Sequence, residues 1–219
     1  MSGRQRGSKR SIRSDTRRWI VGLAIVAAVA TSAGSARADS GTTFGGEVSL
    51  GGAYLASASQ GPDSTDPGHQ PSPAGLAVSL LVRVRRDCLV AGLGGEKVIT
   101  LFSHGESFLG AHAGLALGNE SAQWDILAEG GVHFVNELGS GLLTHTDAPT
   151  VALPYAGVRF GGVTRRGSGP NPGFWIFARF DLARTATVAH LEIIDQRETI
   201  TYDVGGHTVG IVARFVFGR

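Results

Sequence analysis

The 219-residue chain has only one cysteine, Cys88, so it can form neither an internal disulfide nor a cysteine-based metal cluster. Charged residues are scarce, at 17% of the chain. Long apolar runs are also missing, because the most hydrophobic stretch, 19–31, is short and rich in alanine. No segment therefore predicts a confident transmembrane helix.

Basic residues are concentrated at the start of the chain. Residues 1–38 hold eight of the 20 Lys and Arg residues but only one of the 18 Asp and Glu residues. The rest of the chain therefore carries 12 basic and 17 acidic residues, a net charge of −5. This balance argues against a basic surface for nucleic acid.

The first 38 residues have the three parts of a secretory signal peptide. A basic stretch ends at Arg18, an apolar run follows, and 36–38 (Ala-Arg-Ala) form an A-x-A cleavage site. We predict a signal peptide over 1–38, cleaved near Ala38, and one domain over 39–219; an uncleaved anchor is the alternative. Residues 16–21 resemble a twin-arginine export motif, so the export route stays open between this route and the general secretory one.

The last stretch, 207–217, alternates with a period of two residues. Its apolar face consists of Val209, Ile211, Ala213, Phe215 and Phe217. Its other face is small and carries a single charge, on Arg214. This pattern is typical of a membrane barrel strand, with lipid on one side and the lumen on the other.

Seven upstream stretches alternate in the same way, and the 33 glycines suit a barrel with a narrow interior. The eight predicted strands are 43–55, 75–85, 88–96, 107–117, 123–135, 151–162, 174–182 and 207–217. The predicted long connections are 56–73, 97–106, 136–149 and 183–206, the last of which could extend the two strands that flank it. A two-residue turn at Arg86-Asp87 would place Val84 opposite Leu89.

Aromatic residues lie at the ends of the apolar faces. Phe44 and Tyr54 are ten residues apart on one face, and so are Trp124 and Phe134. Ten residues at about 3.3 Å each, in a strand tilted by about 40°, span roughly 25 Å, the height of the apolar band of a membrane barrel. The predicted aromatic interface comprises Phe44, Tyr54, Trp124, Phe134, Phe215 and Phe217.

The opposite strand faces combine small residues with balanced charges. Five acids and five arginines are expected to form a network of ion pairs inside a closed lumen: Glu47, Arg83, Arg85, Glu96, Asp125, Glu129, Arg159, Arg179, Asp181 and Arg214. A solvated outer surface would carry more Lys, Glu and Gln in place of Gly. The pattern therefore favours a membrane barrel over a soluble periplasmic barrel.

The signal peptide, the glycine-rich alternating strands and the aromatic-tipped last strand resemble small outer-membrane barrels of the OmpA/OmpX/OmpW type. The resemblance covers about 43–217 as a pattern and implies an all-β fold, an eight-stranded antiparallel up-and-down transmembrane β-barrel. The chain departs from these barrels at its end, where Gly218-Arg219 follow Phe217.

The strongest catalytic candidate is His112 beside Glu129, a pair that could orient a base for acyl transfer on membrane lipid. We expect instead a satisfied pair in the lumen. His133 with Asp125, or the loop histidines His69, His104, His145 and His190, could suggest a metal, but none has a tight ligand spacing. We therefore expect no metal and no cofactor, and we expect Cys88 to be a small packed residue.

The sequence thus predicts a non-enzymatic outer-membrane barrel with a structural, surface-interaction or small-molecule passage role. Expected partners are outer-membrane lipid, the barrel-assembly machinery and surface contacts made by the loops, and nucleic acid is not expected. The alternatives are a lipid-modifying barrel enzyme, either an acyltransferase or a deacylase, and a soluble periplasmic binding protein.

Overall fold

The computed structural model describes residues 41–60, 73–100, 103–119, 121–140, 145–146, 148–164, 169–193 and 196–218. The predicted signal peptide and its cleavage site lie outside these residues. Nowhere in the described ranges is there a helix of the length and hydropathy needed to cross a membrane.

Within these described ranges, ten strands form one antiparallel sheet, and eight of them close into a barrel because β1 pairs with β10. The strands are β1 (Thr42–Gln60), β2 (Ala74–Arg86), β3 (Leu89–Thr100), β4 (Ser103–Gly118), β5 (Ala122–Ser140), β6 (His145–Thr146), β7 (Val151–Thr164), β8 (Asn171–Asp181), β9 (Thr185–Ile193) and β10 (Gln196–Phe217). The wall follows the order β1-β2-β3-β4-β5-β7-β8-β10. The predicted eight-stranded antiparallel barrel is confirmed.

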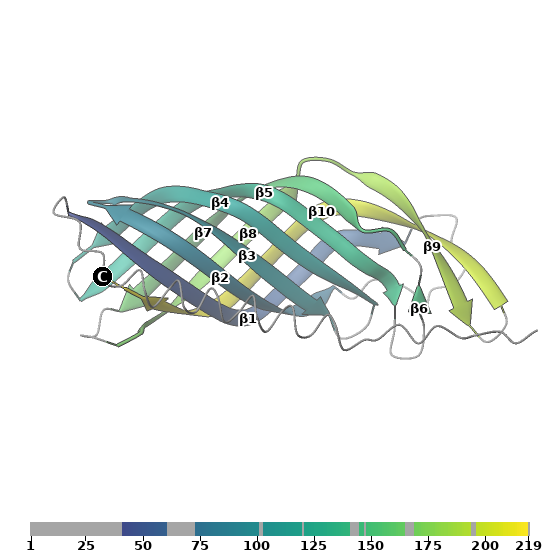
Figure 1. Ribbon diagram of the computed structural model, residues 1–219, viewed down its shortest axis with the longest axis horizontal. Coiled ribbons are helices and arrows are strands. Elements are labelled where there is room, and N and C mark those ends of the chain that lie inside the picture. Colours follow the sequence, from purple (N-terminus) through teal and green to yellow (C-terminus); the bar gives the residue numbers. More distant parts are fainter. Residues whose placement is uncertain are drawn as a thin grey trace, which may run out of the picture.

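Figure 1 shows the barrel from the side, with tilted strands and the C-terminus at one end. That end, called the turn end below, holds the Asp87-Cys88 turn and the start of β1. At the opposite end β9 and β10 run on together beyond the other strands, and β6 pairs with β9 there (Figure 1). Residues 196–206 therefore extend the last predicted strand, whereas 185–193 form a separate strand, β9, rather than an extension of β8.

The predicted loop over 97–106 is wrong. Val98 and Glu106 are fully buried inside the barrel, and β3 and β4 run through this stretch. The strands continue past the apolar band, where outward positions no longer need apolar side chains, so the alternation of hydrophobicity fades while the backbone pairing persists. The connection after the third strand is consequently short.

The predicted register of the hairpin between β2 and β3 is also wrong, by two residues. Arg86 pairs with Leu89, and Val84 pairs with Ala91 rather than with Leu89. The turn residues are Asp87 and Cys88, and Asp87 adopts a φ of 56°, which Asp tolerates in a tight turn. A shift of two residues leaves every side chain on its predicted face, because only an odd shift exchanges the faces.

Candidate functional site: the charged barrel interior

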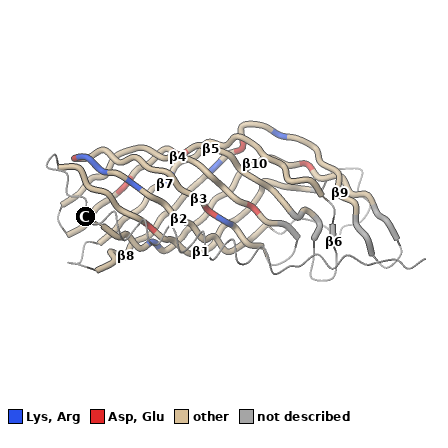
Figure 2. Tube along the Cα trace, in the orientation of Figure 1, with Lys and Arg blue, Asp and Glu red and all other residues tan. Residues whose placement is uncertain are grey.

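The distribution of polarity is the reverse of that in a soluble protein. Outward side chains such as Leu93 (67% exposed) and Ile211 (60% exposed) are apolar, whereas Asp125 and Arg214 point inward and are fully buried. Figure 2 shows how sparsely charged residues occur along the strands. A surface of this kind requires lipid around it, because a contiguous apolar belt in water would drive aggregation.

The first layer of interior charge lies near the turn end. Asp125 of β5 binds Arg83 of β2 at 3.1 Å and Arg214 of β10 at 2.8 Å. Glu47 of β1 lies 3.7 Å from Arg83 and 3.6 Å from Arg214, and it accepts a hydrogen bond from the indole of Trp175. The Arg214 guanidinium lies over the Trp175 ring, 3.9 Å from its centroid. We call these two acids and two arginines the turn-end layer.

A second set of two acids and two arginines lies deeper in the barrel. Glu129 of β5 accepts from Arg159 Nε at 2.6 Å and from Arg179 Nε at 2.7 Å, one arginine on each oxygen. Glu96 of β3 binds the same arginines, with Nη2 distances of 3.3 Å to Arg159 and 3.1 Å to Arg179. Buried charges are tolerated when each is paired and hydrogen-bonded in this way. We call this set the middle layer.

A third polar cluster lies farther from the turn end and is centred on His133. Its Nδ1 lies 2.8 Å from Asp181, and its Nε2 lies 3.3 Å from Glu106. Ser57 donates a hydrogen bond to the other oxygen of Glu106, and the His133 ring stacks on Phe108 at 4.1 Å. Because carboxylates only accept hydrogen bonds, this placement suits a ring protonated on both nitrogens. We call this set the His133 cluster.

The structure thus places the ten predicted network residues in different groups. Eight of them form the turn-end and middle layers, whereas Asp181 belongs to the His133 cluster. Arg85 lies at the turn end, where it donates to Gln123 and to the backbone oxygen of Asp87. The suggested pairing of His133 with Asp125 is wrong, because the two residues belong to separate clusters. Glu106 and Ser57 were missed, since both were assigned to loops.

Side chains fill the interior between these clusters. Leu127, Trp175, Phe177 and Val212 are among the residues of an apolar core inside the barrel. The cavity beside the middle layer has a volume of about 10 Å³ and is lined by Glu96, among others. That is space for roughly one water molecule.

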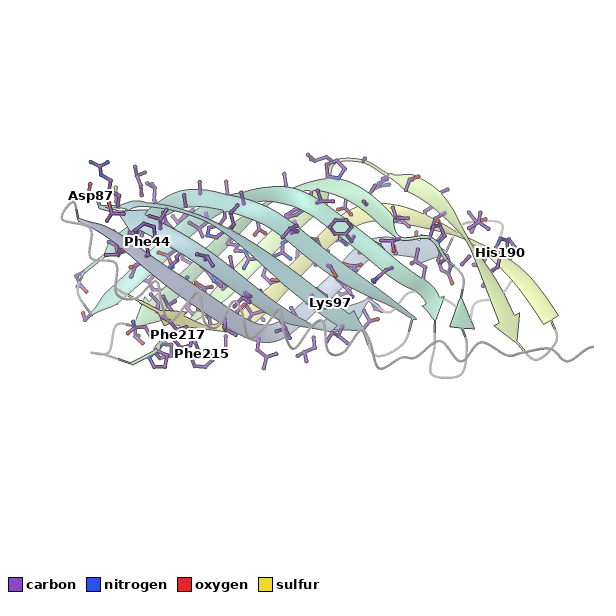
Figure 3. All side chains as sticks on the ribbon, in the orientation of Figure 1. Phe44, Asp87, Lys97, His190, Phe215 and Phe217 are labelled. Carbon is purple, nitrogen blue, oxygen red and sulfur yellow. The ribbon has the colours of Figure 1, made fainter. Side chains whose placement is uncertain are left out.

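The predicted aromatic residues lie on the outer face. Phe44, Phe215 and Phe217 gather near the turn end (Figure 3), and Trp124 stacks on Phe160 in the neighbouring strand. Tyr54 is half-exposed on the outer face, ten residues along β1 from Phe44. Phe134 occupies the equivalent outward position in β5 and is partly exposed.

His112 and Glu129 are register partners on β4 and β5, as the sequence indicates. Both are buried, and each carboxylate oxygen of Glu129 is bonded to an arginine. Both oxygens of the Glu129 carboxylate are thus already engaged by arginine side chains.

The remaining reactive residues are scattered. Cys88 is exposed in its turn, so the expectation that it is packed is wrong. His190 is exposed at the far end and contacts Thr199 (Figure 3). The side chains of His69, His104 and His145 lie outside the described residues. Among the residues that are described, no group of three His, Cys, Asp or Glu side chains could hold a metal ion.

Comparison with solved structures finds small outer-membrane barrels. Neisserial surface protein A has a TM-score of 0.48 at 11% identity, over 80% of this chain and 98% of that one. The outer membrane protein AlkL has a TM-score of 0.47 at 11% identity, over 84% and 95%. OprG from Pseudomonas aeruginosa has a TM-score of 0.41 at 12% identity, over 82% and 97%. No protein-family model matches the chain, and no characterised protein matches it by sequence.

The closed wall, the outward apolar belt and the inward charges together decide the class. This chain is a transmembrane β-barrel of the outer-membrane type. Even strand number, antiparallel neighbours and a lipid-facing belt bounded by aromatic residues are the defining features of that class.

Proposed function

We propose that this barrel is closed to solutes and acts without catalysis. In this proposal it is a membrane-anchored scaffold that presents the end opposite the turn end at the cell surface. The observation that carries this proposal is the pair of buried arginine–carboxylate layers across the lumen. Desolvated and mutually paired side chains do not move aside at low cost, so they act as a plug. Of the roles open to a small barrel, this supports structure or surface interaction over passage.

Conductance in planar lipid bilayers tests the proposal. The purified barrel is expected to give no steady ion current. The variant Glu96→Ala/Arg179→Ala/Asp125→Ala/Arg214→Ala, which deletes one ion pair from each of the two layers, should weaken the plug and raise the conductance. Leu93→Ala/Leu109→Ala is the matched control, because it truncates two outward side chains and leaves the lumen filled. A steady current through the wild-type barrel would contradict the closed lumen.

The absence of catalysis is a separate part of the proposal, and the bonding of Glu129 supports it. Mass spectra of lipid A from cells that express the wild type, His112→Ala or no barrel should be identical. An acyl chain gained or lost only in cells with the wild-type barrel would instead support the lipid-modifying alternative.

We further propose that residues 1–38 are removed near Ala38, that the barrel-assembly machinery inserts the chain and that surface contacts are made by its loops. The apolar belt supports insertion into lipid, because the soluble alternative would leave that belt in water. Sequencing of the mature N-terminus tests the cleavage. Membrane fractionation with a heat-modifiability gel tests insertion. A protein that stays in the soluble fraction and whose band does not shift on boiling would contradict it.

A further inference from the structure

The regular barrel wall is interrupted at one level on three adjacent strands. On β1, Ser57 alone faces Gly205 and Gly206 of β10. On the other side of β10, the four residues 181–184 face the same two glycines, and there β8 ends and β9 begins. Irregularities of this kind bend a sheet locally. Their alignment marks a bend line across the wall.

Gly205 occupies a special conformation on this line. Its φ is +121°, which side chains rarely allow, and a Cβ there would lie 2.5 Å from the carbonyl oxygen of Ala183. Within the described residues, β9 pairs with β10 and β6 but not with β7, and beyond the line β10 pairs with β1 only through residues 202–204. The segment beyond the line therefore has fewer strand neighbours than the barrel proper (Figure 1).

This segment, β9 together with residues 196–204 of β10, is called the outer cap. Its inner face is apolar, through Ala189, Ile200, Tyr202 and Val204. These side chains are buried against the inward residues Val135, Leu138 and Leu153 of β5 and β7. The outer face is polar and exposed, with Asp203 and Thr199 upon it. The outer cap thus closes the interior with an apolar contact above the His133 cluster.

Asp181 connects the bend line to the barrel. Its Oδ2 accepts the backbone N–H of Gly206 at 3.0 Å, and its Oδ1 binds His133 of β5 at 2.8 Å. His133 also reaches Glu106, which in turn holds Ser57 on the bend line of β1. One carboxylate therefore ties the glycine pair of β10 to the opposite wall.

We propose that the outer cap is a hinged lid that bends at Gly205-Gly206 and is held shut by Asp181. A carboxylate accepts from the Gly206 N–H and from a His133 ring protonated on both nitrogens, one bond on each oxygen, whereas an amide has one oxygen and must turn its NH2 group toward one of these two donors. Asp181→Asn keeps the size of the side chain and removes one tie. The lid should then open more often while the barrel below stays closed.

Hydrogen exchange of the whole barrel in lipid, followed by mass spectrometry, tests this proposal. Asp181→Asn should accelerate exchange of the amides in 185–204 by roughly tenfold, as expected for local opening, with less than about a twofold change in 208–216. Asp203→Asn is the matched control, since it removes the same charge from the outer face of the same cap, and its exchange should equal that of the wild type. The hinged-lid proposal does not depend on the conductance experiment, because a lid held by Asp181 is compatible with either a closed or a conducting lumen.

A second variant separates the hinge from its tie. Gly205→Ala disturbs the bend and leaves Asp181 and His133 unchanged, so it should accelerate the same amides. Unchanged exchange in 185–204 for both variants would overturn the proposal. Equal acceleration across 185–204 and 208–216 would also overturn it, because the cap would then open only when the whole barrel unfolds.

Discussion

Arg214 of β10 binds Asp125 of β5 at 2.8 Å, although β8 and β7 separate these strands in the wall. The ion pair therefore bridges the lumen rather than joining neighbouring strands. Both side chains are fully buried. The pair fastens one side of the barrel to another.

Replacement of Arg214 by methionine should destabilise the barrel by about 3–5 kcal/mol, because Asp125 and Glu47 would then share only Arg83. The double variant Arg214→Met/Asp125→Asn should lose less than the two single variants together, since it removes the charges as a pair. Urea titration of the barrel folded in lipid vesicles measures both effects. Arg86→Met, at the exposed end of β2, is the control and should be neutral. Strict additivity of the two single variants would contradict direct coupling across the lumen.

A charge placed on the lipid-facing belt should be costly in a depth-dependent way. Ile211→Arg, near the middle of the belt, should reduce the free energy of folding into vesicles by about 2–4 kcal/mol. Val188→Arg, on the outer face of the outer cap, should change it by less than about 1 kcal/mol. Equal costs at the two positions would argue against a belt that ends before β9.

Cys88 reports the orientation of the barrel because it is exposed at the turn end. An even-stranded barrel keeps its short turns and both termini on the periplasmic side. A membrane-impermeant maleimide should therefore label Cys88 in lysed cells but not in intact cells. Thr199→Cys in a Cys88→Ser background should be labelled in intact cells. The reverse pattern would mean that the outer cap faces the periplasm.

Gly110 should be intolerant of a side chain. A Cβ there would lie 2.5 Å from both the Tyr155 hydroxyl and the Gly130 carbonyl oxygen, inside the barrel. Gly110→Val should abolish the heat-modifiable band of the folded barrel. Gly95→Ala is the control, because its Cβ would meet no atom closer than 3.5 Å. A folded Gly110→Val barrel of normal stability would show that the interior has more room than these contacts allow.

The faces of the strands could be predicted from sequence because alternation is a local property. Arg83 and Arg214 were assigned to the interior from parity alone, and they lie there. The ends of the strands could not be found in this way. Beyond the belt, the outward positions of β3 and β9 need not be apolar, so the signal weakens before the pairing stops.

Which interior charges pair with each other depends on the tilt of the strands. The two-residue alternation of side chains carries no information on that tilt. Asp125 and Glu129 share one face of β5, yet they belong to different layers with different arginines. The bonds of His133 to Asp181 and Glu106 arise from the same stagger. To predict these partners from the sequence, one would need to know which residues meet across the lumen.

Arg214 also has a consequence for assembly of the barrel, because it lies in β10, the last of the barrel strands in chain order. Until β10 joins β1, Glu47 and Asp125 together have one arginine, Arg83, as counter-charge. The same strand therefore supplies both the edge that closes the wall and the second counter-charge of the turn-end layer. A barrel without β10 would retain both an open sheet edge on β1 and an interior carboxylate without its counter-charge.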